Sequence, residues 1–224
     1  MAGTRRLGIL KGGASAENVS VPFIEYHGKK VLFIHIPKTG GSSIERWLES
    51  IAKLRFKTPA IPASLKGTPQ HLTFSELQEL FGESYFDYIF SIVRHPYTRL
   101  ESEYRWRLFT KQTELSFSAW STAVLETYRN NSRHRDNHLR LQVQFLGTPV
   151  RIFRFEDGLE QILRSVSAEA GIPSPHIVPH EKRPAGSYPD LAWTPELQSA
   201  VHEIYQQDFA ELQYDPWMKE NRQA

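Results

Sequence analysis

The sequence contains no cysteine in its 224 residues. Disulfide bonds, thiolate zinc sites and cysteine nucleophiles are therefore excluded. Histidine occurs nine times, but no pair has the His-Glu-x-x-His spacing by which one helix holds zinc. A zinc enzyme is thus poorly supported, and we expect no metal to be required.

Long apolar runs are also missing, since no stretch approaches the roughly 18 to 20 apolar residues that cross a bilayer. Residues 1–6 include two arginines, but no long apolar segment follows them as it would in a secretory signal. We therefore expect no membrane span and, as the default, a cytoplasmic location.

A large charge of either sign is absent as well, because 27 basic and 25 acidic side chains leave a net charge of +2. This balance permits an anionic ligand and gives no reason to expect nucleic acid as a partner. A hydrophobic content of 40% is ordinary for a folded protein. We expect one domain over residues 31–215, an arm and edge segment over 1–30, and a tail over 216–224.

Three short runs rich in β-branched and aromatic residues, at 31–36, 86–93 and 150–155, predict strands. The first has no polar alternation, which is typical of a strand covered on both faces. A short edge strand or hairpin is expected over 19–26, where Pro22 favours an edge position. Helical periodicity or helix-start signals predict helices at about 42–54, 74–81, from 96, 118–128, 158–170 and 195–212, with Ser75 contributing to the cap of the second. The alternation predicts an α/β fold with a P-loop-like parallel sheet flanked by helices.

The junction between the first buried strand and its helix has the composition of an anion site. Its residues are Lys38, Thr39, Gly40, Gly41, Ser42 and Ser43. The first N–H groups of a helix have no partner within the helix, and the helix dipole favours negative charge there. The glycines let the backbone approach a phosphate and adopt positive φ, and the lysine adds a mobile positive charge.

The order of residues in this loop differs from that of a nucleoside triphosphatase. A Walker loop places its lysine after the glycines, whereas Lys38 precedes them. The second buried strand ends at Arg94, and no acidic residue there suits Mg²⁺. These features favour a phosphate-type anion neutralised by protein cations.

Two motifs resemble a known family of sulfotransferases, those related to heparan sulfate 2-O-sulfotransferase and to the HNK-1 group of carbohydrate sulfotransferases. Residues 33–43, Phe-Ile-His-Ile-Pro-Lys-Thr-Gly-Gly-Ser-Ser, resemble the family's 5'-phosphosulfate loop. Residues 91–104 resemble its 3'-phosphate motif, in which an arginine closes a strand and a serine follows on the next helix; Arg94 and Ser102 match. Residues 203–215 are similar to the end of many bacterial members. The resemblance implies the sulfotransferase fold and 3'-phosphoadenosine 5'-phosphosulfate (PAPS) as donor, with the bisphosphate PAP as product.

The resemblance also implies roles for single residues. Lys38 approaches the bridging oxygen of the phosphosulfate, while Arg94 and Ser102 hold the 3'-phosphate. His71 matches the family's general base, a histidine just before a short helix, and its near-neutral pKa suits that task. The remaining loop residues, which hold the 5' group, are Thr39, Gly40, Gly41, Ser42 and Ser43.

The acceptor side is expected along the basic segment 129–140 and just after it. Residues 137–142 resemble a stretch that borders the acceptor in relatives, which marks His138 and Gln142. Arg133 and Arg135 favour an acidic acceptor, with a saccharide hydroxyl as the leading class by resemblance. Lys182 and Arg183, in a late proline-rich loop, match a basic loop that covers the nucleotide.

The sequence leaves open the roles of four histidines and two alternative functions for the chain. His35 is expected to be a core histidine and His95 a helix-start residue, and either His71 or His138 can be the base. A P-loop kinase for small molecules would need Mg²⁺ and ATP, and a non-enzymatic polyanion-binding module would not need Lys38. The sequence identifies neither the acceptor nor the oligomeric state.

Overall fold

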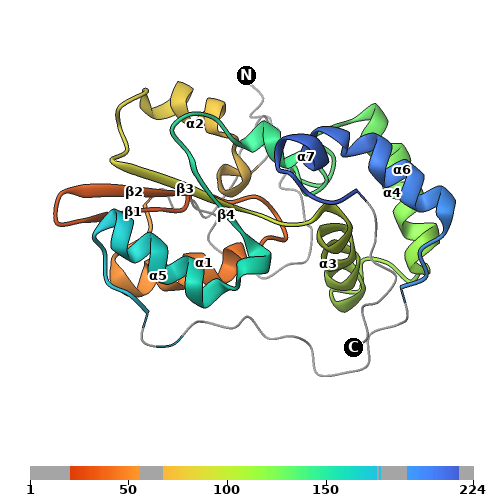
Figure 1. Ribbon diagram of the computed structural model, residues 1–224, viewed down its shortest axis with the longest axis horizontal. Coiled ribbons are helices and arrows are strands. Elements are labelled where there is room, and N and C mark those ends of the chain that lie inside the picture. Colours follow the sequence, from red (N-terminus) through yellow and green to blue (C-terminus); the bar gives the residue numbers. More distant parts are fainter. Residues whose placement is uncertain (1–20, 56–67, 176, 178–190, 217–224) are drawn as a thin grey trace, which may run out of the picture.

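A four-stranded sheet organises the protein (Figure 1). The computed structural model describes residues 21–55, 68–175, 177 and 191–216. The strands are β1 (Phe23–Tyr26), β2 (Lys29–Ile34), β3 (Tyr88–Val93) and β4 (Arg151–Arg154), in the spatial order β1-β2-β3-β4. Strands β2, β3 and β4 run parallel, and β1 pairs antiparallel with β2 at the edge, as expected for a hairpin.

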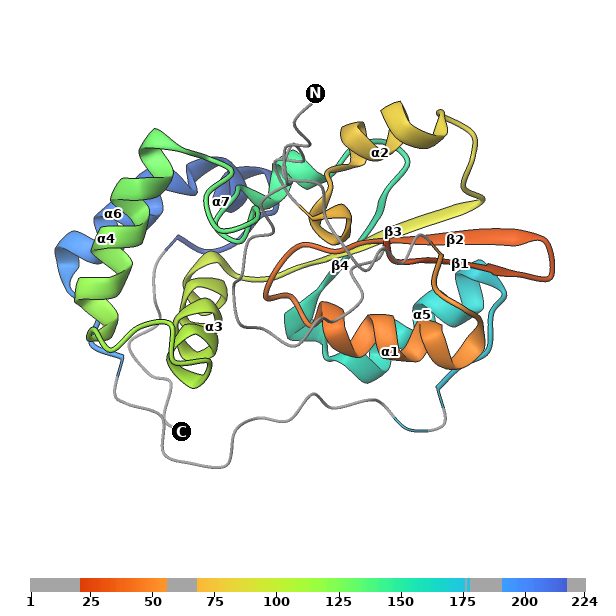
Figure 2. The ribbon, with the colours of Figure 1, turned by 180° about the vertical axis from the view of Figure 1, so that it is seen from behind.

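Helices cover both faces of the sheet and the end where β3 leads into the following helix. Helices α1 (Gly41–Ile51) and α5 (Leu159–Ala170) lie together on one face, and α2 (Phe74–Phe81) lies on the other; the view from behind in Figure 2 agrees. Beyond the sheet stand α3 (Pro96–Phe109), α4 (Phe117–Asn130), α6 (Pro195–Ile204) and α7 (Gln206–Glu211). Short 3-10 turns occur at Pro69–His71, Gln142–Phe145 and Phe155–Asp157. No described helix is long and apolar enough to span a membrane.

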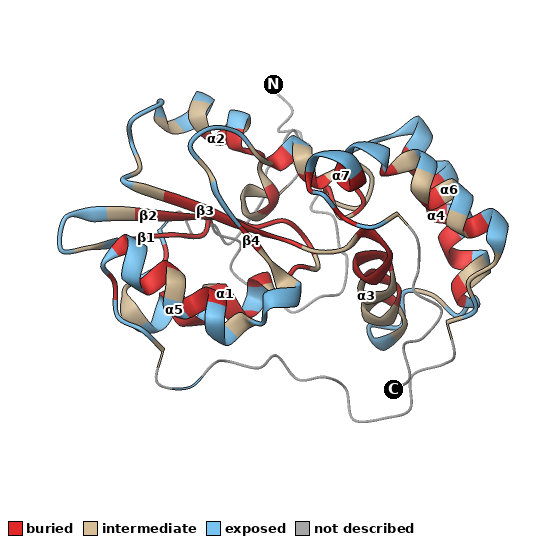
Figure 3. Cartoon of the chain, viewed as in Figure 1, coloured by how far each residue is buried: buried red, intermediate tan, exposed pale blue. Residues whose placement is uncertain are grey.

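Alternation along the strands divides the core into two clusters. Buried residues lie on the sheet and on helices of both faces (Figure 3). Val31 and Phe33 of β2 belong to the cluster with α1 and α5, whereas Leu32 and Ile34 belong to the one with α2 and the other helices. Successive side chains of a strand point to opposite faces, so a fully apolar strand feeds both clusters. The α/β class predicted from the sequence is thereby confirmed.

Two local predictions are corrected by the structure. The single helix expected over 195–212 is two helices, because the helix is interrupted at Tyr205, between α6 and α7. Helix α2 is capped by Thr73 rather than Ser75: the Thr73 hydroxyl accepts from the Glu76 N–H, and the Glu76 carboxylate accepts from the Thr73 N–H. This reciprocal pair satisfies two donors that the helix leaves open.

The register of β2 and β3 brings the two sequence motifs together. Ile34 pairs with Ser91, and the strands run parallel. Lys38, four residues after Ile34, and Arg94, three after Ser91, therefore leave the sheet at the same end. Carboxyl ends of neighbouring parallel strands are where α/β proteins build their ligand sites.

Candidate active site

The loop after β2 enters α1 through left-handed backbone. Lys38 has φ 69° and Gly40 has φ 92°, a region that glycine tolerates and lysine rarely adopts. Helix α1 begins at Gly41 with no side-chain hydrogen bond at its N-cap and no acidic side chain in its first turn, where Ser42 is exposed and Ser43 buried. The first N–H groups and the helix dipole are thus left to an anion.

Two residues of this loop have partners that the sequence does not suggest. The hydroxyl of buried Thr39 donates to the carbonyl of Ile36 at 2.8 Å, so its proton is not available to a phosphosulfate. A Cβ on Gly41 would lie 1.9 Å from Nε2 of His35. Gly41 is therefore required because the His35 imidazole packs directly on the start of α1.

Arg94 stands directly after β3 and reaches the same loop. Its Nη1 donates to the carbonyl of Lys38 at 3.2 Å, and its Nε donates to the Thr98 hydroxyl at 3.2 Å. The guanidinium carbon lies 4.3 Å from the ring centroid of Phe155. These contacts fix a cation beside the loop, in reach of a bound anion.

Gln142 has a different place from the one predicted at the acceptor. Its side chain is fully buried, with Oε1 accepting from the Arg94 N–H and Nε2 donating to the Arg94 carbonyl, both at 2.8 Å. Nε2 also donates to buried Asp208 at 3.3 Å. With its amide engaged in this way, Gln142 holds the backbone of Arg94 and is corrected from an acceptor residue to a structural one.

Helix α3 joins the loop to the segment that follows α4. The buried guanidinium of Arg99 donates to the carbonyls of Pro37 at 3.1 Å, Arg140 at 2.9 Å and His138 at 2.9 Å. Ser102, predicted at the 3'-phosphate, is half-buried on the same helix. Helix α3 therefore contacts both the loop after β2 and the segment 138–140, and a change in α3 should affect both.

His71, the predicted base, is buried and paired with a carboxylate. Its Nδ1 lies 2.7 Å from Oδ2 of Asp136. Burial is the largest influence and lowers the pKa of His71, although Asp136 opposes it. An imidazole that donates from Nδ1 to a carboxylate keeps the lone pair of Nε2, so a neutral His71 is in the tautomer of a general base.

Asp136 reaches His71 from a strained turn. Arg135, Asp136 and Asn137 are consecutive left-handed residues, with φ of 54°, 58° and 64°. Such backbone costs roughly 1–2 kcal/mol per L-residue, least for Asn and Asp. The turn clamps the chain around His71: Asp136 accepts from the Thr68 N–H at 2.6 Å and hydroxyl at 2.8 Å, and Asn137 Nδ2 donates to the His71 carbonyl at 2.9 Å.

Three imidazoles, His35, His71 and His138, form what we call the histidine row. Ring centroids of successive members lie 4.9 and 5.0 Å apart, with planes at 83° and 85°. Each Nδ1 has its own carboxylate, namely Glu45 at 2.6 Å, Asp136 at 2.7 Å and Glu103 at 2.8 Å. The row connects the start of α1 to α3. His35 is a buried, paired histidine as expected, and His95 caps α3 by accepting from the Tyr97 N–H.

His138 and its carboxylate repeat the arrangement of His71 and Asp136. Burial lowers the pKa of His138 too, with Glu103 opposing. Burial alone would raise the pKa of Glu103, but His138, Arg107 and Lys38 outweigh it and keep the pKa far below its usual range. Both histidines are thus neutral beside ionised carboxylates at neutral pH.

One group of side chains has the composition of a metal site. Ligand atoms of His71, Asp136 and His138 lie within 4.8 Å of one another. However, both oxygens of Asp136 already accept hydrogen bonds, from Thr68 and from the Nδ1 of His71. This donor set suits a carboxylate that orients a base better than one that binds an ion.

The remaining residues predicted at the acceptor or the cofactor are two arginines, which lie near the surface, and two residues of the late loop. Arg133 is exposed and pairs with Glu76 at 3.0 Å, and Arg135 is half-buried. Lys182 and Arg183 lie outside the described residues.

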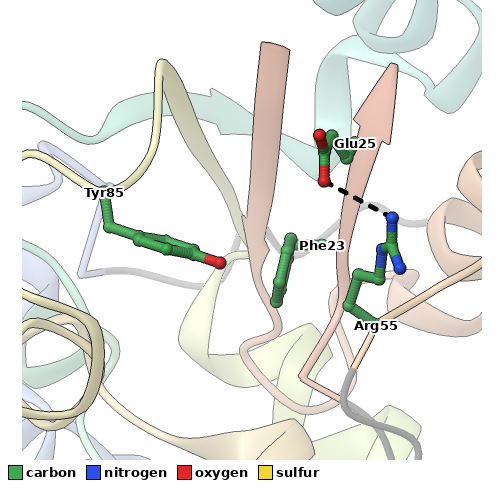
Figure 4. Close-up of a pocket in the computed structure, with 4 residues that line it drawn as sticks. All are labelled: Phe23, Glu25, Arg55 and Tyr85. Atoms are coloured by element: carbon green, nitrogen blue, oxygen red, sulfur yellow. Dashed lines mark hydrogen bonds and ion pairs between the residues drawn. The ribbon is translucent and has the colours of Figure 1, made fainter. Parts of the chain in front are cut away.

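A separate hollow lies at the outer edge of the sheet, lined by Phe23, Glu25, Arg55 and Tyr85 (Figure 4). The Arg55 guanidinium pairs with the Glu25 carboxylate across it at 3.4 Å. No residue of the loop or of the histidine row lines this hollow, so we assign it no part in the chemistry.

Residues missed by the sequence analysis are mostly the carboxylates, above all Asp136, Glu103 and Glu45. The one signal for Asp136 is the Asp-Asn pair before His138, since these types tolerate left-handed backbone. Glu103 has no local signal, because its partner His138 lies 35 residues later in the sequence. Glu45 lies ten residues after His35, but no pattern marks the two as partners.

Comparison with known proteins assigns the chain to a family. The family model described as "Sulfotransferase family" matches residues 22–215. Neither the curated proteins nor the solved structures gave a match.

Proposed function

Because the chain belongs to the sulfotransferase family and is therefore a sulfuryl-transfer enzyme, we propose that it moves the sulfuryl group of PAPS to an acceptor hydroxyl with His71 as the base. The observation that carries this proposal is the short path from the base to the anion site. His71 packs on His35, and His35 packs on Gly41 at the start of α1. Only one imidazole separates the base from the helix terminus.

The donor side rests on cations and backbone N–H groups. When bound, PAPS supplies a sulfuryl group on a phosphate leaving group. The start of α1 and the ammonium of Lys38 offset charge on the leaving phosphate, and Arg94 takes the 3'-phosphate, for which a planar guanidinium is suited. Ser102 adds a hydroxyl on α3. This arrangement requires no metal.

The base side moves one proton. The acceptor oxygen forms a bond to sulfur while the bond from sulfur to the bridging oxygen breaks, and that oxygen keeps the electron pair. Nε2 of His71 takes the acceptor proton, and Asp136 stabilises the imidazolium. Positioning of the two oxygens in line is the other contribution.

A saccharide that carries negative charge is the acceptor class we favour. Arg133 and Arg135 both come just before Asp136 in the sequence, and His134 lies between them. Charge reversal at both arginines should raise the acceptor KM and leave PAP affinity unchanged. An unchanged acceptor KM would remove the acidic acceptor from the proposal.

Calorimetry with PAP in the absence of metal tests the donor assignment. Wild type should bind in the micromolar range, about −8 kcal/mol. Arg94→Ala should lose much of this affinity. Arg164→Ala is the matched control, since Arg164 is exposed and pairs with Glu160 on the same helix. His71→Ala should bind PAP normally and transfer no sulfate.

The same experiment separates the alternatives. A kinase would bind ATP with Mg²⁺ and not PAP, which would overturn the proposal. A polyanion-binding module would keep its ligand when Lys38 is changed to Ala, whereas a sulfotransferase should lose turnover.

A further inference from the structure

Trp106 of α3 lies between the donor loop and the histidine row. The Lys38 ammonium is 5.1 Å from the centroid of the Trp106 ring. The ring of His138, the end of the row, is 5.6 Å from the same indole at an angle of 33°. The half-buried indole thus touches the group expected at the leaving oxygen and the neighbour of the base.

The charge around Trp106 favours an ammonium at this place. Glu103, one helical turn earlier on α3, is buried and ionised, with Arg107 at 2.6 Å and His138 at 2.8 Å. Lys38 is among the cations that lower the pKa of Glu103. The Arg107 guanidinium also lies 4.5 Å from the Trp106 centroid. Indole attracts cations through its negative face, and the Glu103 charge adds to that attraction.

The backbone of Lys38 leaves only the side chain to move. Its φ of 69° and the hydrogen bond from Arg94 to its carbonyl fix the main chain. A lysine has four rotatable bonds beyond this point, and its ammonium is a mobile charge. A side chain that restricts those rotations therefore determines where the Lys38 ammonium lies in the ligand-free protein.

We infer that Trp106 is a positioning residue for sulfuryl transfer, which rests on the function proposed above: its indole holds the Lys38 ammonium beside the base in the ligand-free enzyme and yields it to the phosphosulfate when the donor binds. Lys38 therefore changes partners during each turnover. Trp106 acts through Lys38 and not on the substrate.

Tryptophan fluorescence tests the contact itself, with Trp106 as one of five tryptophans. In the ligand-free protein, Lys38→Met should change the emission in the wild-type background and not in the Trp106→Phe background. PAP should change the emission of wild type and should change it much less in Trp106→Phe. Equal changes with and without Trp106 would overturn the inference, and the ligand-free comparison gives a result even where PAP fails to bind.

Kinetics tests the role, with water as the acceptor so that no saccharide is needed. We expect Trp106→Leu to slow formation of PAP from PAPS by about 3- to 30-fold without weakening the binding of PAP. Trp106→Phe, which keeps an aromatic face, should recover most of the rate. Trp193→Phe removes an indole that donates to Glu101 of α3 and is the control for a general disturbance of that helix. Full activity of Trp106→Leu, or a parallel loss of rate and PAP affinity in both variants, would show that the ring does not position Lys38.

Discussion

The donor loop and the histidine row lie side by side but are built in different ways. The loop is one continuous segment that the register of β2 and β3 presents to Arg94. The row takes its three histidines and three carboxylates from the loop after β2, from α1 and α3, from the turn before α2 and from the turn after α4. The site that we propose for phosphate is thus made mainly from local backbone, whereas the proposed base needs a partner from elsewhere in the chain.

The largest effect on turnover is expected from a change at Asp136, the carboxylate on which His71 depends. Asp136→Asn keeps the size of the side chain but can donate to Nδ1 of His71, so Nε2 would carry the proton and lose its basicity. We expect turnover from PAPS to fall by about 10²- to 10⁴-fold. PAP affinity, measured by calorimetry, should stay within the error of wild type.

The exposed Asp87→Asn is the control for this variant, because the Asp87 carboxylate accepts from the Lys30 N–H of the hairpin. If PAP affinity falls as much as turnover in Asp136→Asn, the donor loop and the histidine row do not act separately. Normal turnover would show that Asp136 does not set the tautomer of His71.

This contrast explains how far the sequence could be interpreted. The strand runs and the Lys38 loop are contiguous, so pattern and residue type sufficed for the fold class and for placing this loop between a buried strand and a helix. The role of Gln142 could not be found in this way, because its side chain is satisfied by the backbone of Arg94, 48 residues earlier. The hydrogen bond of the Thr39 hydroxyl could not be predicted either, because residue type alone does not reveal the Ile36 carbonyl beside it.

The next prediction concerns Gly41, the point where the two regions touch. Gly41→Ala would place a methyl group 1.9 Å from Nε2 of His35. Overpacking of this kind destabilises by about 1–3 kcal/mol, and urea unfolding should show it. PAP affinity and turnover should both fall, since the methyl group disturbs the helix start and the row together.

Ser42→Ala, at the exposed neighbouring position, should leave the free energy of unfolding nearly unchanged. The double variant Gly41→Ala/His35→Ala should lose less free energy of unfolding than the two single variants together, because the contact that causes the strain is gone. Strict additivity would show that His35 is not the obstacle.

A smaller and more specific effect is expected from pH. Burial lowers the pKa of His71 below its usual value near 6.5, although Asp136 raises it in part. Turnover from PAPS should therefore be constant above about pH 6.5 and fall only at lower pH, as the base is protonated. In Asp136→Ala the remaining activity should have its acid limb at still lower pH, since a group that raises the pKa is removed.

The pH dependence of PAP binding is the internal comparison for that experiment. The donor loop and Arg94 contain no histidine, so PAP affinity should change with pH only as the phosphates of PAP are protonated, at about pH 6, and to the same extent in wild type and Asp136→Ala. An acid limb at or above pH 7 in the wild-type rate would contradict a neutral, buried base.

The smallest effect should come from the strain in the turn that holds Asp136. Arg135 has φ 54°, and its Nε is buried with no hydrogen-bond partner among the described residues. Arg135→Gly removes the left-handed penalty of roughly 1–2 kcal/mol, and the greater backbone freedom of glycine offsets about 0.5–1 kcal/mol of that. The free energy of unfolding in urea should rise by about 0.5 kcal/mol, while turnover with water as acceptor stays near wild type because glycine keeps the turn. Arg135→Ala removes the same side chain but keeps the strained backbone, so it should be less stable than Arg135→Gly; if the two variants are equally stable, the turn is not strained at this residue and Asp136 is held by its hydrogen bonds alone.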